Sequence, residues 1–96
     1  MSIVLIGGHE RMRKEYKIAA KEYGCKLKVF TYDMPRLDRC IGCPDCVIML
    51  TDIVSHNMIS QAMKICKKKN LQNIRVHNSS LKSIKETLSE LSSKTA

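Results

Sequence analysis

The three histidines of this 96-residue chain all stand shortly after apolar segments that have the character of β-strands. His9 follows residues 3–8, His56 follows residues 46–50 and a short loop, and His77 follows residues 74–76. If the strands are parallel, their carboxyl ends share one edge of a sheet, the edge where open α/β sheets bind ligands. Imidazole is both a metal ligand and a partner for anions, so we expect a binding site at this edge.

Three imidazoles are a ligand set that can hold a transition metal. A single imidazole can also be an axial ligand of haem iron. The leading prediction is therefore that His9, His56 and His77 bind a metal ion, iron or zinc, or an iron-containing cofactor such as haem. A carboxylate from Glu10 or Asp52 could complete or orient such a centre.

The same edge carries groups that suit an anion, which is the alternative prediction. Gly7 and Gly8 stand at a strand-to-helix turn, where backbone N–H groups are able to face a ligand, and Arg11 adds a fixed fork of donors. Helix N-termini favour anions. The other polar residues placed here are Thr51, Asp52, Ser55, Asn57, Asn78, Ser79 and Ser80. The ligand in this case would be a phosphorylated metabolite, a nucleotide or a nucleic acid.

Ordinary structural roles compete with both predictions. Serine and asparagine are common helix caps, and two glycines form many turns. Gly7 and Gly8 also lack the third glycine of a dinucleotide fingerprint and the lysine of a P-loop. Ser55 beside His56 is not a catalytic triad, and no Cys-x5-Arg loop is present, so the sequence favours a binding or sensing domain over an enzyme.

A second candidate site is the segment Cys40-Ile-Gly-Cys43-Pro-Asp-Cys46, with two overlapping C-x-x-C units. This spacing is typical of metal or iron–sulfur ligation, and a redox-sensitive thiol pair is a further interpretation. Because the segment leads into an apolar strand, Cys46 is expected in the core. Cys40 and Cys43 are expected at the opposite, amino edge of the sheet, where we assign them as secondary metal ligands.

The elements that must position these residues alternate between strand and helix, which predicts an α/β domain with a parallel sheet. We expect strands over residues 3–6, 26–31, 46–50 and 73–76, and helices over about 10–23, 57–69 and 81–91. Gly24 and Asn70 stand where helix C-terminal caps are expected. Residues 32–44 have room for one helical turn at most. The domain is expected over residues 1–91, with a frayed polar tail over 92–96.

The composition of the strands predicts their order in the sheet. Residues 3–6 and 46–50 are apolar throughout, as central parallel strands should be, whereas the other two strands are mixed, as edge strands should be. Right-handed crossovers then favour the order 2-1-3-4. This is a small flavodoxin- or Rossmann-like three-layer arrangement with about three helices, and its switch point lies between strands one and three.

The composition and charge of the chain indicate which kinds of partner it binds. The chain has 17 basic and 9 acidic residues, a formal charge of +8, and its basic residues gather on the first expected helix and at residues 67–69. This excess favours an anionic partner, nucleic acid included, although no aromatic stacking platform accompanies it.

No apolar run is long enough to span a membrane, and the first residues form a strand pattern with no signal peptide. We therefore expect a cytoplasmic protein, in which five cysteines are free thiols, metal ligands or redox groups and not a disulfide framework. Two exposed sheet edges and limited burial predict a homodimer.

Several motifs together resemble a small bacterial family of single-domain proteins of unknown function. They are residues 2–12 (SIVLIGGHERM), Lys28-Val-Phe30, Ile41-Gly-x-Pro-Asp45, Val54-Ser-His-x-Met58 and His77-Asn-Ser-Ser-Leu81, in which x is any residue. The resemblance covers most of the chain and implies one intact α/β domain, with no settled activity to carry over. The positions typical of the family are His9, Arg11, Met12, Ser55, His56, Met58, His77 and the serines after it. They coincide with the carboxyl-edge site, to which we assign Gly8, Arg11, Ser55, Met58, Asn78 and Ser79 as binding residues. The cysteines are additions of this sequence.

Overall fold

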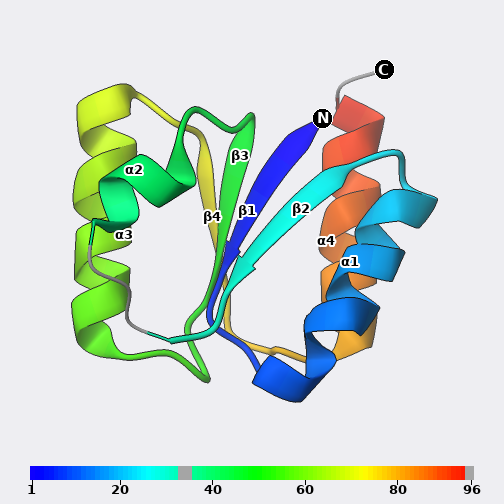
Figure 1. Cartoon of the computed structure of the whole chain (residues 1–96). Helices are drawn as coiled ribbons and strands as arrows, with labels where there is room; N and C mark the ends of the chain where they lie inside the picture. The colour runs from blue at the N-terminus through cyan, green and yellow to red at the C-terminus, as the bar shows by residue number, and fades with distance from the viewer. Residues whose placement is uncertain (33–35, 95–96) are drawn as a thin grey trace.

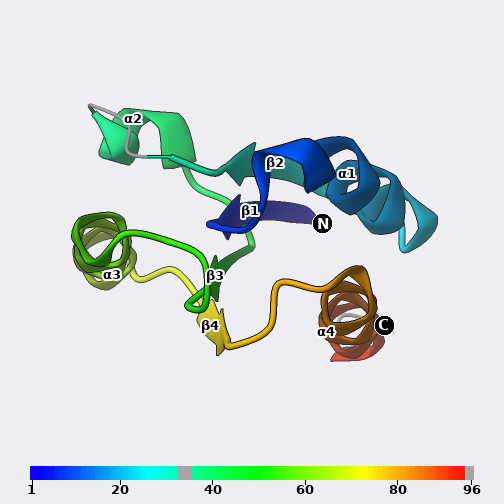
Figure 2. The same ribbon diagram turned by 90° about the horizontal axis from the view of Figure 1, so that it is seen from below.

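The computed structural model describes residues 1–32 and 36–94 and shows a three-layer α/β domain (Figures 1 and 2). Within these residues, β1 (Ser2–Ile6), β2 (Lys26–Phe30), β3 (Cys46–Leu50) and β4 (Asn73–Val76) form one sheet in the order β2-β1-β3-β4. All three strand pairs are parallel. The predicted fold class and strand order are therefore confirmed.

The central strands are apolar because both of their faces are covered. Side chains of alternate residues point to opposite faces of a strand. Leu5 and Ile48 therefore pack with one pair of helices, and Val4 and Val47 pack with the other pair. All of β3 is buried, whereas β2 and β4 at the sheet edges have exposed residues in alternation.

Helices α1 (Arg13–Glu22) and α4 (Leu81–Lys94) cover one face, and α2 (Leu37–Ile41) and α3 (His56–Lys69) cover the other (Figure 2). A short 3₁₀ helix, η1 (Glu10–Met12), precedes α1. The predicted caps are present. Gly24 has φ +70° just after α1, and Asn70 closes α3 in the left-handed conformation at φ 56°.

The helices differ from the expected ones in two places. The segment between β2 and β3 contains a fourth helix, α2, which is too short to produce a readable period and is held by the buried side chains of Leu37 and Ile41. The last helix does not end at Leu91 but continues through Lys94, so most of the expected frayed tail is helical. Of residues 32–44, Asp33, Met34 and Pro35 lie outside the described residues. Over the described part of the chain, no helix combines the length and apolar character needed to cross a bilayer.

Candidate functional site

The three histidines lie at one edge of the sheet, each after the carboxyl end of a parallel strand. His9 is half-buried, and His56 and His77 are exposed. However, among residues 1–32 and 36–94, no group of three or more His, Cys, Asp or Glu side chains is placed to hold a metal ion. The predicted shared edge is thus present, but the structure does not gather the imidazoles into a metal-ligand cluster.

A buried tyrosine joins the loops of this edge. Tyr16 of α1 is fully buried, and its hydroxyl donates to the backbone carbonyl of Ser79 at 2.7 Å. Burial raises the pKa of the Tyr16 hydroxyl, and the Asp52 carboxylate raises it further, while hydrogen bonds with the His9 backbone and Ser79 act in the opposite direction. Tyr16 therefore links the loop after β1 to the loop after β4.

The sequence pattern placed Tyr16 only on the apolar face of its helix. The signal that could have identified its role is chemical, because a buried tyrosine hydroxyl needs a hydrogen-bond partner.

Asp52 connects the loop after β3 to the start of α4. Its carboxylate accepts hydrogen bonds from the backbone N–H of Ser79 at 2.9 Å and from the Ser79 hydroxyl at 3.0 Å. Ser79 is only 5% exposed. A carboxylate near a helix start satisfies N–H groups and complements the helix dipole. The N–H and hydroxyl of Ser79 are therefore engaged by Asp52, and the expected role of this residue in ligand binding stays a prediction.

The glycines also have an internal role. Gly7 and Gly8 have positive φ, and their N–H groups donate to the carbonyl oxygens of Phe30 and Ile53, both at 2.8 Å. A Cβ atom on Gly8 would lie 3.0 Å from the Tyr16 ring and hydroxyl. The Gly8 N–H is thus engaged within the protein, and the expected role of Gly8 in ligand binding stays a prediction. A Cβ atom on Gly7 would lie 2.8 Å from the Leu50 carbonyl oxygen and 2.9 Å from that of Ile53, so Gly7 allows the loops after β1 and β3 to touch each other.

Helix α3 begins beside this contact between loops. The Ser55 hydroxyl accepts a hydrogen bond from the Met58 N–H at 3.1 Å, so Ser55 is the helix N-cap. His56 is exposed in the first turn, which contains no acidic residue. Met58 is only 1% exposed and packs in the core on the α2–α3 side of the sheet, which gives it a structural role; its assignment as a binding residue stays a prediction.

Two further polar groups border the edge. The Thr51 hydroxyl lies 2.6 Å from Nδ1 of the exposed His77, which orients the ring. Asn78 is also exposed, and its side-chain oxygen accepts a hydrogen bond from the Ser80 N–H at 2.9 Å, so it shapes the turn before α4.

Near the end of β2, the carboxylate of Glu10 contacts both the guanidinium of Arg13 and the hydroxyl of Thr31. The Glu10 carboxylate lies 3.6 Å from the Arg13 guanidinium and bonds to the Thr31 hydroxyl. Nε of Arg13 is buried and has no hydrogen-bond partner among the described residues. Arg11 is exposed beside this group, and its guanidinium has no ion pair within the described chain.

The cysteines lie elsewhere. Cys40 is at the end of α2, Cys43 is exposed and Cys46 is buried at the start of β3. The amino edge is confirmed as their location, since the Asp45 N–H between them donates to the carbonyl of Ser2 at the start of β1. Lys69 of α3 closes the end of α2 by donating to the carbonyl oxygens of Asp38 and Gly42 at 2.9 and 3.0 Å. No metal-ligand group of three or more forms here among the described residues.

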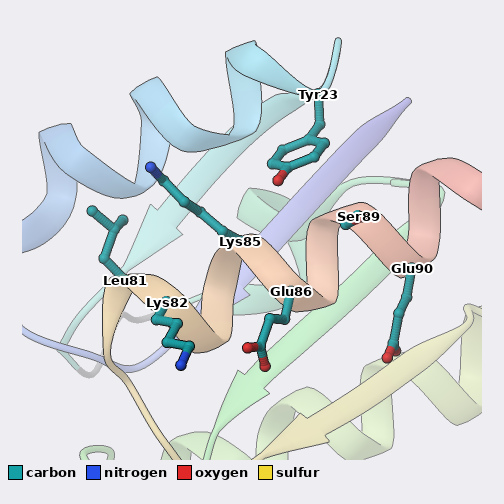
Figure 3. A pocket seen from close by; sticks show the side chains of 7 residues that line it. All are labelled: Tyr23, Leu81, Lys82, Lys85, Glu86, Ser89 and Glu90. Carbon is teal, nitrogen blue, oxygen red and sulfur yellow. The ribbon is translucent and has the colours of Figure 1, made fainter.

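An open groove of about 610 Å³ runs along α4 from Leu81 to Glu90 and past Tyr23 at the end of α1. Figure 3 shows Tyr23 pointing toward α4 and Lys85 pointing back toward α1, while Glu86 and Glu90 point away from α1. Lys85 lies 3.8 Å from Glu22 of α1. The lysine and the two glutamates thus point in different directions. Small-molecule sites instead have a few polar groups that converge on one point, so this groove does not have the arrangement of such a site.

Comparison with solved structures confirms the fold. A de novo designed Rossmann fold protein superposes with a TM-score of 0.71 at 19% identity, covering 97% of this chain and 99% of the other. The solution structure of a de novo designed Rossmann 2x2 fold protein gives 0.67 at 16% identity, covering 100% and 91%. Likeness at this identity concerns the fold alone, because function depends on the residues placed on it.

No functionally curated protein is similar enough to the chain to count as a relative. A family model described as "Uncharacterized protein conserved in bacteria (DUF2325)" matches residues 2–91, which include all the carboxyl-edge residues discussed above. The chain belongs to this bacterial family.

Proposed function

We propose that this protein is a binding module that holds a phosphorylated small molecule or nucleotide at the carboxyl edge of its sheet, beside the start of α3. One observation carries the proposal: the loops after β1 and β3 touch through the bond from the Gly8 N–H to Ile53, and this contact lies at the switch point of the sheet. Ligands of open α/β sheets bind at such points.

The groups beside the contact suit an anion. Arg11 follows it on the β1 side, and Ser55 and His56 follow it on the β3 side. Helix α3 has 14 residues and no acidic residue in its first turn, so its positive dipole end is not neutralised within that turn. The start of α4 differs, because Asp52 already supplies a carboxylate there. The anion is therefore expected at α3 and not at α4.

The experiment is a thermal-shift titration with inorganic phosphate and with ADP, followed by calorimetry. Saturating ligand at about 100 times its dissociation constant should stabilise the fold by about 2.7 kcal/mol. Arg11→Ala should weaken binding at least about tenfold, as loss of a charge-assisted hydrogen bond does. Arg39→Ala is the matched control, since Arg39 is also exposed but lies on α2. Absence of stabilisation by either probe, or equal losses in both variants, would contradict the proposal.

A second candidate is the metal or haem function, and the orientation of His77 favours it. Histidines that bind metals have one ring nitrogen held by a hydrogen bond, and Thr51 contacts Nδ1 of His77 in this way. In a homodimer, His77 of a second copy could supply a further ligand. Metal analysis and an absorption spectrum of protein purified without oxygen test this candidate. A colourless, metal-free protein that takes up no iron, zinc or haem stoichiometrically would refute it.

We also propose that the protein is a homodimer. Strands β2 and β4 are the edges of the sheet, and their unpaired backbone groups favour association. Light scattering at micromolar concentration should give twice the monomer mass, and a monomer would contradict the proposal. We also place the protein in the cytoplasm, where reducing conditions suit the five free thiols.

A further inference from the structure

The outward face of α1 carries a row of exposed lysines. Lys14, Lys17 and Lys21 lie on this face together with Ile18, and we name the four residues the α1 lysine face. From the structure we infer that the α1 lysine face binds duplex nucleic acid through its phosphates. This inference does not depend on the proposed small-molecule site, because it uses different residues.

Helix geometry brings the four side chains together. At about 100° per residue, they fall within a sector of roughly 100°, and the three lysines span about 10 Å along the helix axis. The opposite face holds Tyr16, Ala19 and Ala20, which are buried against the sheet. The lysines therefore project from a helix whose orientation is fixed by its core contacts.

The positive charge of this face is not cancelled by nearby carboxylates. Glu15 and Glu22 occupy the flank of α1, and Glu22 turns toward Lys85 of α4 at 3.8 Å. On the other flank, Arg13 pairs with Glu10. None of Lys14, Lys17 and Lys21 has an ion pair within the described chain, so all three remain available for an anionic partner.

The chemistry of the face favours duplex nucleic acid over other polyanions. A helix that lies on a membrane needs a broad apolar face, but here Ile18, at 60% exposed, is the single apolar residue. Single strands are held by aromatic side chains on which bases stack, and the α1 lysine face has none. Evenly spaced ammonium groups suit the phosphate rows of a duplex, in which contact is independent of sequence.

The test is fluorescence anisotropy with a labelled DNA duplex of mixed sequence, titrated with the intact protein at several salt concentrations. The variant is Lys14→Gln, Lys17→Gln and Lys21→Gln together. The matched control is Lys64→Gln, Lys67→Gln and Lys68→Gln, which removes the same charge from exposed positions on α3. Circular dichroism confirms that both variants fold.

Three phosphate contacts predict a salt slope of at least about −2.7 for the wild type, or a loss of about 40-fold in affinity between roughly 50 and 200 mM salt. The Lys14, Lys17 and Lys21 variant should lose most of this dependence of affinity on salt. The control variant on α3 should keep it. Failure of the wild type to bind the duplex, equal losses in both variants, or equal affinity for anionic lipid vesicles or single strands would overturn the inference.

Discussion

Replacing Tyr16 by phenylalanine removes a single oxygen atom, but we expect it to lower the free energy of unfolding substantially. The Tyr16 hydroxyl is fully buried and donates to the Ser79 carbonyl at 2.7 Å. Phenylalanine preserves the ring packing but leaves that carbonyl without this donor. An unsatisfied buried polar group costs about 1–3 kcal/mol, so we expect a loss of about 2 kcal/mol in the free energy of unfolding.

Urea unfolding at neutral pH measures this loss directly. For a domain of this size, about 2 kcal/mol corresponds to a decrease of roughly 8–16 °C in Tm. Tyr32→Phe is the matched control, since Tyr32 is 60% exposed and should change stability by no more than about 0.5 kcal/mol. If Tyr16→Phe costs no more than Tyr32→Phe, Tyr16 does not hold the carboxyl-edge loops together and our reasoning is refuted.

The same residue predicts a loss of stability in alkali. Burial raises the pKa of the Tyr16 hydroxyl above the ordinary 10.0 and that of the Cys66 thiol above the ordinary 9.0. A raised pKa contributes stability that is complete below the ordinary value and is lost as pH rises through the raised value, because the unfolded chain ionises first. The free energy of unfolding should therefore fall above about pH 9, and less steeply in Tyr16→Phe and Cys66→Ala. Identical pH profiles in wild type and variants would contradict this.

Three further predictions concern the same loops and the opposite edge. Gly8→Ala should cost at least about 2 kcal/mol more than Gly24→Ala, since a Cβ on Gly8 meets Tyr16 and one on Gly24 meets nothing within 4 Å; equal costs in thermal unfolding would argue against the tight loop contact. Asp52→Asn should lower the free energy of unfolding by about 1–2 kcal/mol, because the carboxylate accepts two hydrogen bonds near the start of α4; an unchanged urea midpoint would contradict this role. In native protein, iodoacetamide should label exposed Cys43 well before buried Cys46, and mass spectrometry showing the reverse order would contradict the fold at the amino edge.

The sheet was readable from the sequence because burial on both faces leaves a strong pattern. The bounds predicted for β3 and β4 agree with the structure, and the apolar residues 3–6 of β1 and 46–50 of β3 identified the centre of the sheet. Helix α2 was missed because five residues contain too little of a helical period, and its stability comes from the packing of Leu37 and Ile41.

The carboxyl-edge site was only partly predictable, for a different reason. The sequence identified the edge and its polar residues, but it could not distinguish groups that face a ligand from groups that bind each other. Ser79 and Gly8 proved to have internal partners, because Tyr16 and Asp52 bond to Ser79 and Tyr16 encloses Gly8. Met58 is buried in the core on the α2–α3 side of the sheet. The hydrogen bonds of Ser79 with Tyr16 and Asp52 join residues 63 and 27 positions apart and leave no local pattern.

The most direct test of the proposed function follows the backbone amide signals of isotope-labelled protein by NMR while ADP or inorganic phosphate is added. Our account predicts that the largest shifts occur at residues 55–57 at the start of α3 and at Arg11, and that the amide of Ser79, already bonded to Asp52, changes little. Absence of shifts at millimolar ligand, or shifts confined to the start of α4, would contradict the account.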